Sequence, residues 1–544
     1  MKVTLLYPRW TGSYGLMAAF ARRNSTWPPL NLALLAAIAE HDGHDVTMVD
    51  GEAEALSVEQ MVRRVKRINP DAIGLTSFTP FFHLNVRLAE ALKEAGVQAP
   101  IIVGGPHVRI MGEKAFLPPF DYAFVGEAEK SWPAFLKHLE NGTDVRAVKG
   151  IWYRKDGVAQ TTGEPEPMED PDGKGFPLDQ FPLPARHLLP MGRYKLGTLK
   201  GRLGMTSIQT TRGCPWKCIF CASEVLLTTR VIRRSPTSVV SEMKSVVSDF
   251  GIRHFYIVDD VMTLNPEHIV EIADRIIAEG LKITFEGSTR ANLVEDKVIG
   301  RLAEAGLIRL SFGLETVDAE MRKTMKKKVP LKYYEEANRI CNKYKVEALN
   351  SVMIGLPGET RETVQKTLDW LRSARDVMQA NFAIAVPYPG TEFHDMAVSG
   401  GNGVTLMTKD FSEYRRYGSA VTTVGDLTPD DLIDLQNDGF VSIYSAPWRW
   451  APMLRKHGII GGALMLLRVF RMVAGRYFPK KNGTRKVLFS PGDGSITTVS
   501  LSKVANKQVG APNLITLTDS SISFKEPGIA PAGHFGDPKS PNSL

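Results

Sequence analysis

The stretch RGCPWKCIFC, residues 212–221, holds three of the four cysteines of a 544-residue chain. Cys214, Cys218 and Cys221 have the spacing C-x3-C-x2-C, and the arginine, glycine, proline and lysine around them are typical of a loop. A structural zinc site needs four protein ligands, usually from two separated pairs, and the sequence has no second pair. Three thiolates suit a cubane iron–sulfur cluster and leave one iron free for a ligand that is not protein. We therefore predict a [4Fe-4S] cluster with an open iron.

Apolar runs and helical patterns alternate downstream of this loop. The predicted strands contain SIQT, FYIVDD, ITFEGSTR, RLSFGLE, ALNSVMIGLPG and NFAIAVPYPG. The helices between them are predicted at 236–249, 266–279, 294–305, 331–344 and 361–377. Six βα units in sequence favour a partial (β/α)6 barrel over residues 204–395, with its chemistry on the loops that follow the strands. The cysteines occupy the loop after the first of these strands.

The first 145 residues show a second alternation of strands and helices. The runs KVTLLYP, DVTMVD, AIGLTS, IIVGG and YAFVG are nearly continuously apolar, and helical patterns separate them. Strands of this kind form a parallel sheet that is covered on both faces. We predict a doubly wound, Rossmann-like α/β domain over residues 1–145, with its ligand at the C-terminal ends of the strands.

Three further segments complete the predicted organisation. Residues 146–203 are rich in proline, glycine and acidic residues, which indicates a linker or cap with little regular structure. Residues 396–482 are predicted to be mainly helical. Residues 483–544 are rich in serine, proline, glycine and threonine and thin in periodic apolar residues, so we predict a disordered tail.

Composition and charge limit the function classes. Four cysteines in 544 residues exclude a disulfide framework and favour a reducing compartment. The start, MKVTLLYPRW, is typical of a first strand and not of a secretion signal, so we predict a cytoplasmic protein. The net charge of +8 is spread along most of the chain, and no basic patch is interleaved with aromatic residues. We therefore predict no binding of nucleic acid.

With the cysteine spacing and the six βα units in place, residues 200–395 resemble the radical S-adenosylmethionine (SAM) enzymes. In that family the open iron of the cluster binds the amino and carboxylate groups of SAM. The resemblance implies that Phe220 contacts adenine and that FGLE (312–315), IGLPGET (354–360) and PYPGTEF (387–393) contact SAM, with Glu315 in the first of these. One electron from the cluster then cleaves SAM to methionine and a 5'-deoxyadenosyl radical.

One motif departs from the family. Many members have a Gly-Gly-Glu type sequence after the second strand, where this chain has Asp259 and Asp260. Either carboxylate could accept hydrogen bonds from the SAM ammonium group, and a residue that leads into the following helix is the alternative for Asp260. Arg290 ends the third strand, where its fork of donors could bind the SAM carboxylate or pair with Glu315.

The first domain resembles the cobalamin-binding domain of one large subfamily, through WPPLNLALLAAIAEHDGHDVTMVDGE, GLTSFTPFF, IVGGPHVR and FVGEAE. Gly104 and Gly105 would let a corrin approach the backbone closely, and Ser77 and Thr79 offer hydroxyl groups to its amide side chains.

The segment after the first strand lacks the motif that ligates cobalt in other cobalamin domains. That motif is D-x-H-x-x-G, and this chain has YPRWTGSYG at the corresponding place. Residues 42–44, Asp-Gly-His, come nearest to it but are typical of a turn. His107 is predicted to be a hydrogen-bonding loop residue. The resemblance thus implies cobalamin without a histidine as lower ligand.

A basic apolar stretch occupies residues 448–481. Its uninterrupted apolar part is about half the length that spans a bilayer, which excludes a transmembrane helix. Two alternatives stay open: an amphipathic helix that lies on an anionic membrane surface, or helices that pack on the barrel with their arginines outward.

Taken together, these features predict a cobalamin-dependent radical SAM methyltransferase that acts on an unactivated carbon of a small molecule. A lipophilic substrate would suit the basic apolar stretch. The resemblance also implies an electron donor such as flavodoxin or ferredoxin. An oxidative cyclase or rearrangement enzyme of the anaerobic magnesium-protoporphyrin IX monomethyl ester cyclase type is the first alternative. A non-catalytic cobalamin or redox sensor is the second. No catalytic side chain is predicted.

Overall fold

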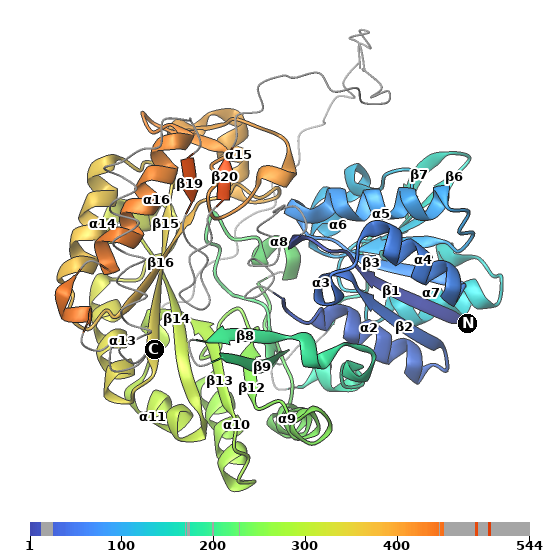
Figure 1. The fold of residues 1–544 in the computed structure, drawn as a ribbon, viewed down its shortest axis with the longest axis horizontal. Helices are drawn as coiled ribbons and strands as arrows, with labels where there is room; N and C mark the ends of the chain where they lie inside the picture. The colour runs from blue at the N-terminus through green and yellow to red at the C-terminus, as the bar shows by residue number, and fades with distance from the viewer. Residues whose placement is uncertain are drawn as a thin grey trace, which may run out of the picture. The chain divides into compact units, whose positions relative to one another are not determined.

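The computed structural model describes residues 1–11, 26–168, 170, 175–198, 201–227, 229–444, 446–450, 485–487 and 499–501. Two seven-stranded sheets organise these residues, one in each half of the chain (Figure 1). None of the described helices combines the length and the hydropathy that crossing a membrane would require.

The first sheet has the strand order β2-β1-β3-β4-β5-β6-β7, and its first five strands run parallel. Those five are β1 (Lys2–Tyr7), β2 (Asp45–Asp50), β3 (Ala72–Thr76), β4 (Ile101–Gly104) and β5 (Tyr122–Phe124). The main connecting helices are α2 (Leu30–His41), α4 (Val58–Ile68), α5 (Phe82–Glu94), α6 (Pro106–Met111) and α7 (Ser131–Glu140). The predicted doubly wound α/β fold is confirmed.

The helix α4 illustrates why these segments form helices. Ser57 caps its first turn in a capping box with Gln60, which satisfies two backbone groups that a helix end leaves unpaired. Met61 and Val65, one turn apart, are buried, and the arginines and lysine between and beyond them lie on the other face.

Two antiparallel strands extend this sheet beyond the predicted domain boundary. β6 (Ile151–Lys155) pairs with β5, and β7 (Val158–Thr161) pairs with β6. Asp156 and Gly157 join them with φ of 51° and 79°, as a two-residue hairpin turn requires. The prediction of little regular structure over residues 146–203 is wrong here, because the backbone of β6 pairs with the edge of β5 and the Asp-Gly turn fixes the register of the hairpin.

The second sheet has the strand order β16-β15-β14-β13-β12-β9-β8. Six of its strands run parallel: β9 (Gly201–Ile208), β12 (His254–Ile257), β13 (Thr284–Thr289), β14 (Leu307–Glu315), β15 (Glu347–Ile354) and β16 (Gln379–Ile384). β8 (Lys195–Thr198) adds an antiparallel edge to β9. The predicted partial barrel is confirmed.

Five long helices connect the parallel strands of this sheet. They are α9 (Pro236–Phe250), α10 (Pro266–Ala278), α11 (Asp296–Ala305), α13 (Leu331–Lys343) and α14 (Arg361–Ser373). Figure 1 shows α11, α13 and α14 along one side of the sheet. In β15, in β16 and over residues 310–314 of β14, every second residue is buried and its neighbours are partly exposed, so one face is covered by helices and the other is accessible.

The residues after β16 form a mixed region. α15 (Glu392–Ser399) and α16 (Pro429–Tyr444) flank an antiparallel pair, β17 (Val404–Leu406) with β18 (Thr422–Val424). This region therefore contains strands as well as the predicted helices. Strands β19 (Arg485–Val487) and β20 (Val499–Leu501) pair within the segment predicted to be disordered. The rest of that segment and residues 451–481 of the basic stretch lie outside the described residues.

Arg449 belongs to the basic stretch but is fully buried. Its guanidinium donates hydrogen bonds to the carbonyl oxygens of Val377 (2.9 Å), Ile443 (3.0 Å) and Ala374 (3.3 Å), and to that of Leu371. Leu371 and Ala374 end α14, whose last carbonyls have no partner within the helix. The prediction that the arginines of this stretch point outward is wrong for Arg449, because these carbonyls need donors.

We expect Arg449→Met to lower the free energy of unfolding by about 3 kcal/mol, since it leaves several buried carbonyls unpaired. The midpoint of urea unfolding, followed by circular dichroism, measures the change. Arg372→Met, at an exposed position of α14, is the matched control and should shift the midpoint little. Equal shifts of the unfolding midpoint in the two variants would contradict the prediction that Arg449 stabilises the fold by pairing these buried carbonyl groups.

The loop that follows β15 closes on a buried carboxyl group. Glu359 accepts hydrogen bonds from the backbone N–H groups of Gly355 and Leu356, the latter at 3.3 Å. Burial raises the pKa of Glu359 to about 8, although these two donors act in the opposite direction. The side chain is therefore a neutral carboxylic acid at neutral pH.

A raised pKa in the folded state means that stability falls as the pH rises from the unfolded value of 4.5 to about 8. Glu359→Gln keeps an oxygen for both hydrogen bonds but cannot ionise. We expect the thermal midpoint of this variant, relative to that of the unmodified protein, to be higher at about pH 8.5 than at about pH 5.5. A difference that does not change with pH would show that Glu359 is ionised throughout.

Candidate functional site

Asp259 anchors the start of the cysteine loop. Its buried carboxylate follows β12 and accepts hydrogen bonds from the backbone N–H of Thr210 (2.7 Å), the hydroxyl of Thr211 (2.9 Å) and the hydroxyl of Thr210. Burial raises the pKa of Asp259 to about 6, against the effect of these donors. Its acceptor capacity is thus largely used by the loop.

Asp260 holds the same loop on both sides of the cysteines. Its carboxylate accepts hydrogen bonds from the backbone N–H of Gly213 (3.2 Å) and the hydroxyl of Ser223 (2.8 Å). Ser223 in turn lies 3.3 Å from the sulfur of Cys221. Asp260 lies in the segment between β12 and α10, but Asn265 and not Asp260 caps the helix. The proposed contact with a SAM ammonium group stays a prediction for both aspartates.

The three cysteines are partly exposed, and a backbone hydrogen bond of 2.9 Å joins the N–H of Cys221 to the carbonyl of Cys218. Burial raises the pKa of the Cys214 and Cys218 thiols, and the positive charges of Lys327 and Arg290 act in the opposite direction at Cys218. Those cations favour the thiolate form, which is the form that binds iron.

Within the described residues, no three His, Cys, Asp or Glu side chains converge on one position for a metal ion. A cubane cluster needs no such point, because each cysteine ligates a different iron. The donor set of three thiols on one loop, with cations beside it, fits a cluster better than a single ion.

Arg290 lies directly above the cysteine loop. Its Nη1 is 3.8 Å from the sulfur of Cys218, and its guanidinium lies 4.2 Å from the ring centre of Trp216. Its Nε is buried without a hydrogen-bond partner. Glu315 does not pair with Arg290 but with Lys327, at 2.7 Å. The alternative of an Arg290–Glu315 pair is therefore wrong, and Arg290 keeps a donor for another acceptor.

Lys327 is a buried residue of the site that the sequence analysis missed. Burial acts against its charge, but Glu315 outweighs this effect and raises its pKa. Gly313 makes room for the pair, because a Cβ there would collide with both charged groups. The sequence shows only a run of three lysines, which is more typical of a surface.

Phe220 is partly buried and packs against the main core. The adjacent Ile219 donates from its N–H to the carbonyl of Met325 (3.3 Å) and accepts from the N–H of Phe393 (2.9 Å). Segments that follow β14 and β16 thus hold the end of the cysteine loop. The contact of Phe220 with adenine stays a prediction.

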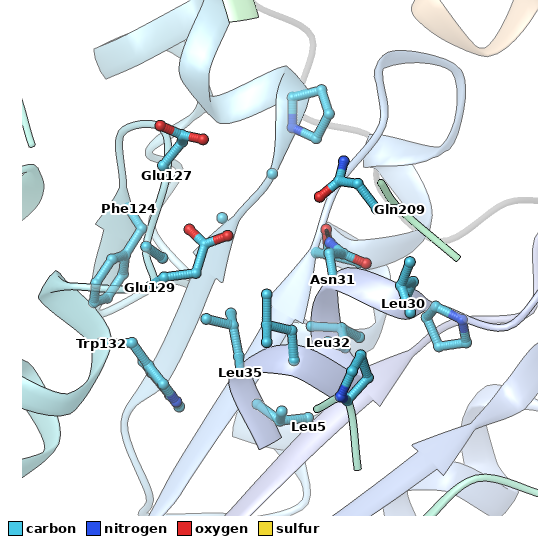
Figure 2. A pocket seen from close by; sticks show the side chains of 18 of the residues that line it. Leu5, Leu30, Asn31, Leu32, Leu35, Phe124, Glu127, Glu129, Trp132 and Gln209 are labelled. Carbon is cyan, nitrogen blue, oxygen red and sulfur yellow. Dashed lines mark hydrogen bonds between the residues drawn. The ribbon is translucent and has the colours of Figure 1, made fainter. Parts of the chain in front are cut away.

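A largely apolar cavity of about 660 Å³ lies at the C-terminal ends of the parallel strands of the first sheet. Figure 2 shows Leu5, Leu30, Leu32, Leu35, Phe124 and Trp132 around it, with Asn31, Glu127, Glu129 and Gln209 as polar groups. This is the edge at which doubly wound sheets bind their ligands.

Gly104 and Gly105 line the cavity, as the sequence analysis expects. Gly105 has φ of 95°, and a Cβ there would lie 2.7 Å from the backbone nitrogen of Ser77, so only glycine fits. The hydroxyl of Ser77 is buried and donates to the carbonyl of Gly104 (2.8 Å), and that of Thr79 lies 3.2 Å from Nδ1 of His107. Both hydroxyls therefore have partners within the domain, and their contact with a corrin stays a prediction.

Histidine is not found among the described residues that line the cavity. The undescribed residues 12–25, which follow β1, contain no histidine in the sequence. His107 is buried beside Phe82 and Phe411, and burial lowers its pKa to about 4. Residues 42–44 end α2 as a turn, as predicted.

Arg212, at the start of the cysteine loop, also lines the cavity. Its guanidinium pairs with Glu127 (2.5 Å) and Glu129 (2.8 Å), which follow β5 of the first sheet. Burial acts against its charge, but Glu129 and Glu127 outweigh this and raise its pKa. Ser207 and Gln209 line the cavity as well. The loop that carries the three cysteines thus forms part of the cavity wall.

Comparison with known proteins agrees with this arrangement. Residues 208–371 match the family model of the radical SAM superfamily, and residues 17–136 match that of the B12 binding domain. The chain is similar to hopanoid C-3 methylase from Methylococcus capsulatus, with 30% identity over 376 residues, 67% of this chain and 67% of that protein. It is also similar to the anaerobic magnesium-protoporphyrin IX monomethyl ester cyclase of Rubrivivax gelatinosus, with 26% identity over 76% of this chain and 72% of the cyclase.

Among solved structures, the fold is similar to that of the radical SAM methyltransferase TsrM from Kitasatospora setae, solved with cobalamin and a [4Fe-4S] cluster. The TM-score is 0.63 at 17% identity, covering 82% of this chain and 88% of TsrM. The range that matches the B12 binding domain lies in the domain of the first sheet, which forms most of the cavity. The range that matches the radical SAM superfamily lies in the second sheet, which carries the cysteine loop. The chain therefore belongs to the radical SAM enzymes that carry a B12-binding domain.

Proposed function

We propose that this enzyme transfers a methyl group from cobalamin to an unactivated carbon of a small molecule. The observation that carries the proposal is the position of Arg212, which begins the cysteine loop and at the same time lines the apolar cavity. A cluster held by that loop and a corrin held in that cavity would be neighbours. A substrate bound between the cluster and the corrin would then lie within reach of both cofactors.

When bound, the cluster with SAM supplies a radical that removes a hydrogen atom, and cobalamin, methylated by a second SAM, supplies the methyl group. The protein's own residues would bind and orient the cofactors and the substrate, and they would exclude water from the site. Cys214, Cys218 and Cys221 would hold the cluster. Asp259 and Asp260 would keep the loop in one conformation through the hydrogen bonds described above.

Arg290 is the residue that we propose for the SAM carboxylate. Its Nε is buried without a partner, its Nη1 lies beside Cys218, and Trp216 supports the plane of its guanidinium. A guanidinium in this setting can bind a carboxylate through two parallel hydrogen bonds. Phe220 would contact adenine.

Cobalamin is proposed to bind without a histidine below the cobalt. The described cavity lining and the sequence of residues 12–25 both lack histidine, which supports this proposal. Gly104 and Gly105 would let the corrin approach the backbone. The electron donor is proposed to be a protein such as flavodoxin or ferredoxin, and contact of residues 448–481 with a membrane surface stays a proposal.

Product analysis separates methyl transfer from the alternatives. We expect the reduced enzyme, reconstituted anaerobically with iron, sulfide and hydroxocobalamin, to convert SAM to both S-adenosylhomocysteine and 5'-deoxyadenosine. An oxidative cyclase would release 5'-deoxyadenosine alone, because it moves no methyl group. A non-catalytic sensor would release neither product.

The cluster prediction is tested by metal analysis. We expect about four irons and one cobalt per chain in the reconstituted protein, and loss of the iron in a triple variant, Cys214→Ala, Cys218→Ala and Cys221→Ala. Cobalt should be retained, because most of the residues that line the cavity belong to the first sheet and its helices, and none of the three cysteines lines it. Cys341→Ala, a buried cysteine of α13, is the control and should keep its iron. Iron retained in the triple variant would refute the assignment.

Arg290→Gln should raise the KM for SAM about tenfold or more, because one charge-assisted bidentate contact is lost. Iron content and the visible spectrum of the cluster should not change. The KM is measured from the rate of 5'-deoxyadenosine formation. Arg275→Gln, on the exposed face of α10, is the control. An unchanged KM in Arg290→Gln would place the SAM carboxylate elsewhere.

A further inference from the structure

Polar side chains gather at one end of the apolar cavity. Figure 2 shows Glu127, Glu129, Asn31 and Gln209 above the apolar side chains of Leu5, Leu35 and Trp132. The two glutamates follow β5, the asparagine lies in the first turn of α2, and the glutamine follows β9. The cavity is lined mainly by apolar groups elsewhere, so hydrogen bonds to a ligand concentrate at this end.

Arg212 uses only part of the acceptor capacity of the two carboxylates. It pairs with Oε1 of Glu127 and with Oε1 of Glu129. In the part of the chain that the structure describes, no donor bonds to either Oε2, and neither Oε2 belongs to the buried polar atoms that lack a partner. Glu129 is only 8% exposed and lines the cavity, so its open oxygen faces this space.

The two side-chain amides are held by the protein on one side only. Oε1 of Gln209 accepts from Nε (3.3 Å) and Nη2 (3.1 Å) of Arg212, which leaves the Nε2 donors of this glutamine without a partner among the described residues. Nδ2 of Asn31 donates to the hydroxyl of Thr76 (2.8 Å), and its Oδ1 stays open in the same sense. This end of the cavity thus offers one N–H donor group and three acceptors.

The other two arginines that line the cavity have partners within the protein. Arg234 donates to the carbonyl (3.2 Å) and the hydroxyl (2.8 Å) of Ser238, and it also pairs with Glu242. Arg109 pairs with Glu164. The polar end of the cavity therefore presents carboxylate oxygens to a ligand next to guanidinium groups that already have acceptors.

A primary amide matches this set of open groups. Its N–H₂ group can donate to a carboxylate oxygen of Glu127 or Glu129, and its carbonyl can accept from Nε2 of Gln209. An ionised carboxylate has no donor and would place its negative charge against the two glutamates. The pattern thus distinguishes an amide from the acid that has nearly the same shape.

We propose that Glu127, Glu129 and Gln209, with Asn31, bind amide side chains at the rim of the corrin and select a corrinoid in which these side chains are amidated. The inference rests on the proposed function, in which the cavity holds cobalamin. The two glutamates would then have two tasks, because they also stabilise the charge of Arg212. They would be specificity-determining residues for the cofactor, and no step of the reaction passes through them.

The test compares hydroxocobalamin with cobalamins in which one propionamide of the corrin is hydrolysed to a propionate, each isomer separately. Dissociation constants are measured by equilibrium dialysis and visible absorption on the full chain, reconstituted with iron and sulfide. The variants are Glu127→Gln and Glu54→Gln. Glu54 is the matched control, because it pairs with Arg64 (2.8 Å) and is not among the described residues that line the cavity.

We expect the unmodified protein to bind at least one propionate isomer about tenfold or more weakly than hydroxocobalamin, because a propionate is ionised at neutral pH and meets like charge. In Glu127→Gln this ratio should fall to about threefold or less, since the new amide keeps an oxygen for Arg212 and removes the negative charge. Glu54→Gln should keep the full ratio. The comparison of ligands on the unmodified protein needs no variant to fold.

Equal binding of hydroxocobalamin and every propionate isomer by the unmodified protein overturns the proposal. A ratio that Glu127→Gln and Glu54→Gln leave equally unchanged overturns it as well. Neither result touches the proposed function, which formation of S-adenosylhomocysteine and 5'-deoxyadenosine tests. Absence of any hydroxocobalamin binding by the unmodified protein would contradict both the amide site and the proposed role of cobalamin.

Discussion

The ion pairs of Arg212 with Glu127 and Glu129 join the cysteine loop to the cavity of the first sheet. Chemistry shared between a cluster and a corrin requires that the two be held at one separation, and a loop alone would not ensure this. The Arg212 side chain is largely buried, so its two carboxylate partners must stay in place to stabilise its charge. The position of the cavity is thereby coupled to that of the cysteines.

Buried charge also shapes the rest of the site. Asp259 and Asp260 accept hydrogen bonds from the cysteine loop, and Lys327 and Glu315 form an ion pair that neutralises both charges. Arg290 is different, because its Nε has no partner although it is buried. A buried donor without a hydrogen-bond partner lowers the stability of the folded state. Such a donor is typical of a site where a ligand supplies the missing acceptor. Most polar groups of this site thus bind other groups of the protein, whereas Arg290 keeps a donor for a ligand.

Much of the architecture could be predicted because it depends on local patterns. The parallel strands, the helix over residues 58–68 and the position of the cysteine loop follow from apolar periodicity and from spacing along the chain. The hairpin β6–β7 was missed, since its strands are short and its surroundings are rich in proline and glycine. The burial of Arg449 could not be predicted, because the sequence of a basic stretch does not show whether an arginine is exposed to solvent or donates hydrogen bonds to buried carbonyl groups.

Residue types at fixed spacings are enough to predict the fold class, the cluster-binding role of the three cysteines and the family resemblance. Which charged side chains pair with one another depends on the folded structure. Arg212 and Glu127 are 85 residues apart, and the lysine that pairs with Glu315 is the middle one of three in a row. Pairings of this kind depend on how the sheets and loops pack, and desolvation in the folded state selects among partners that look equivalent along the chain.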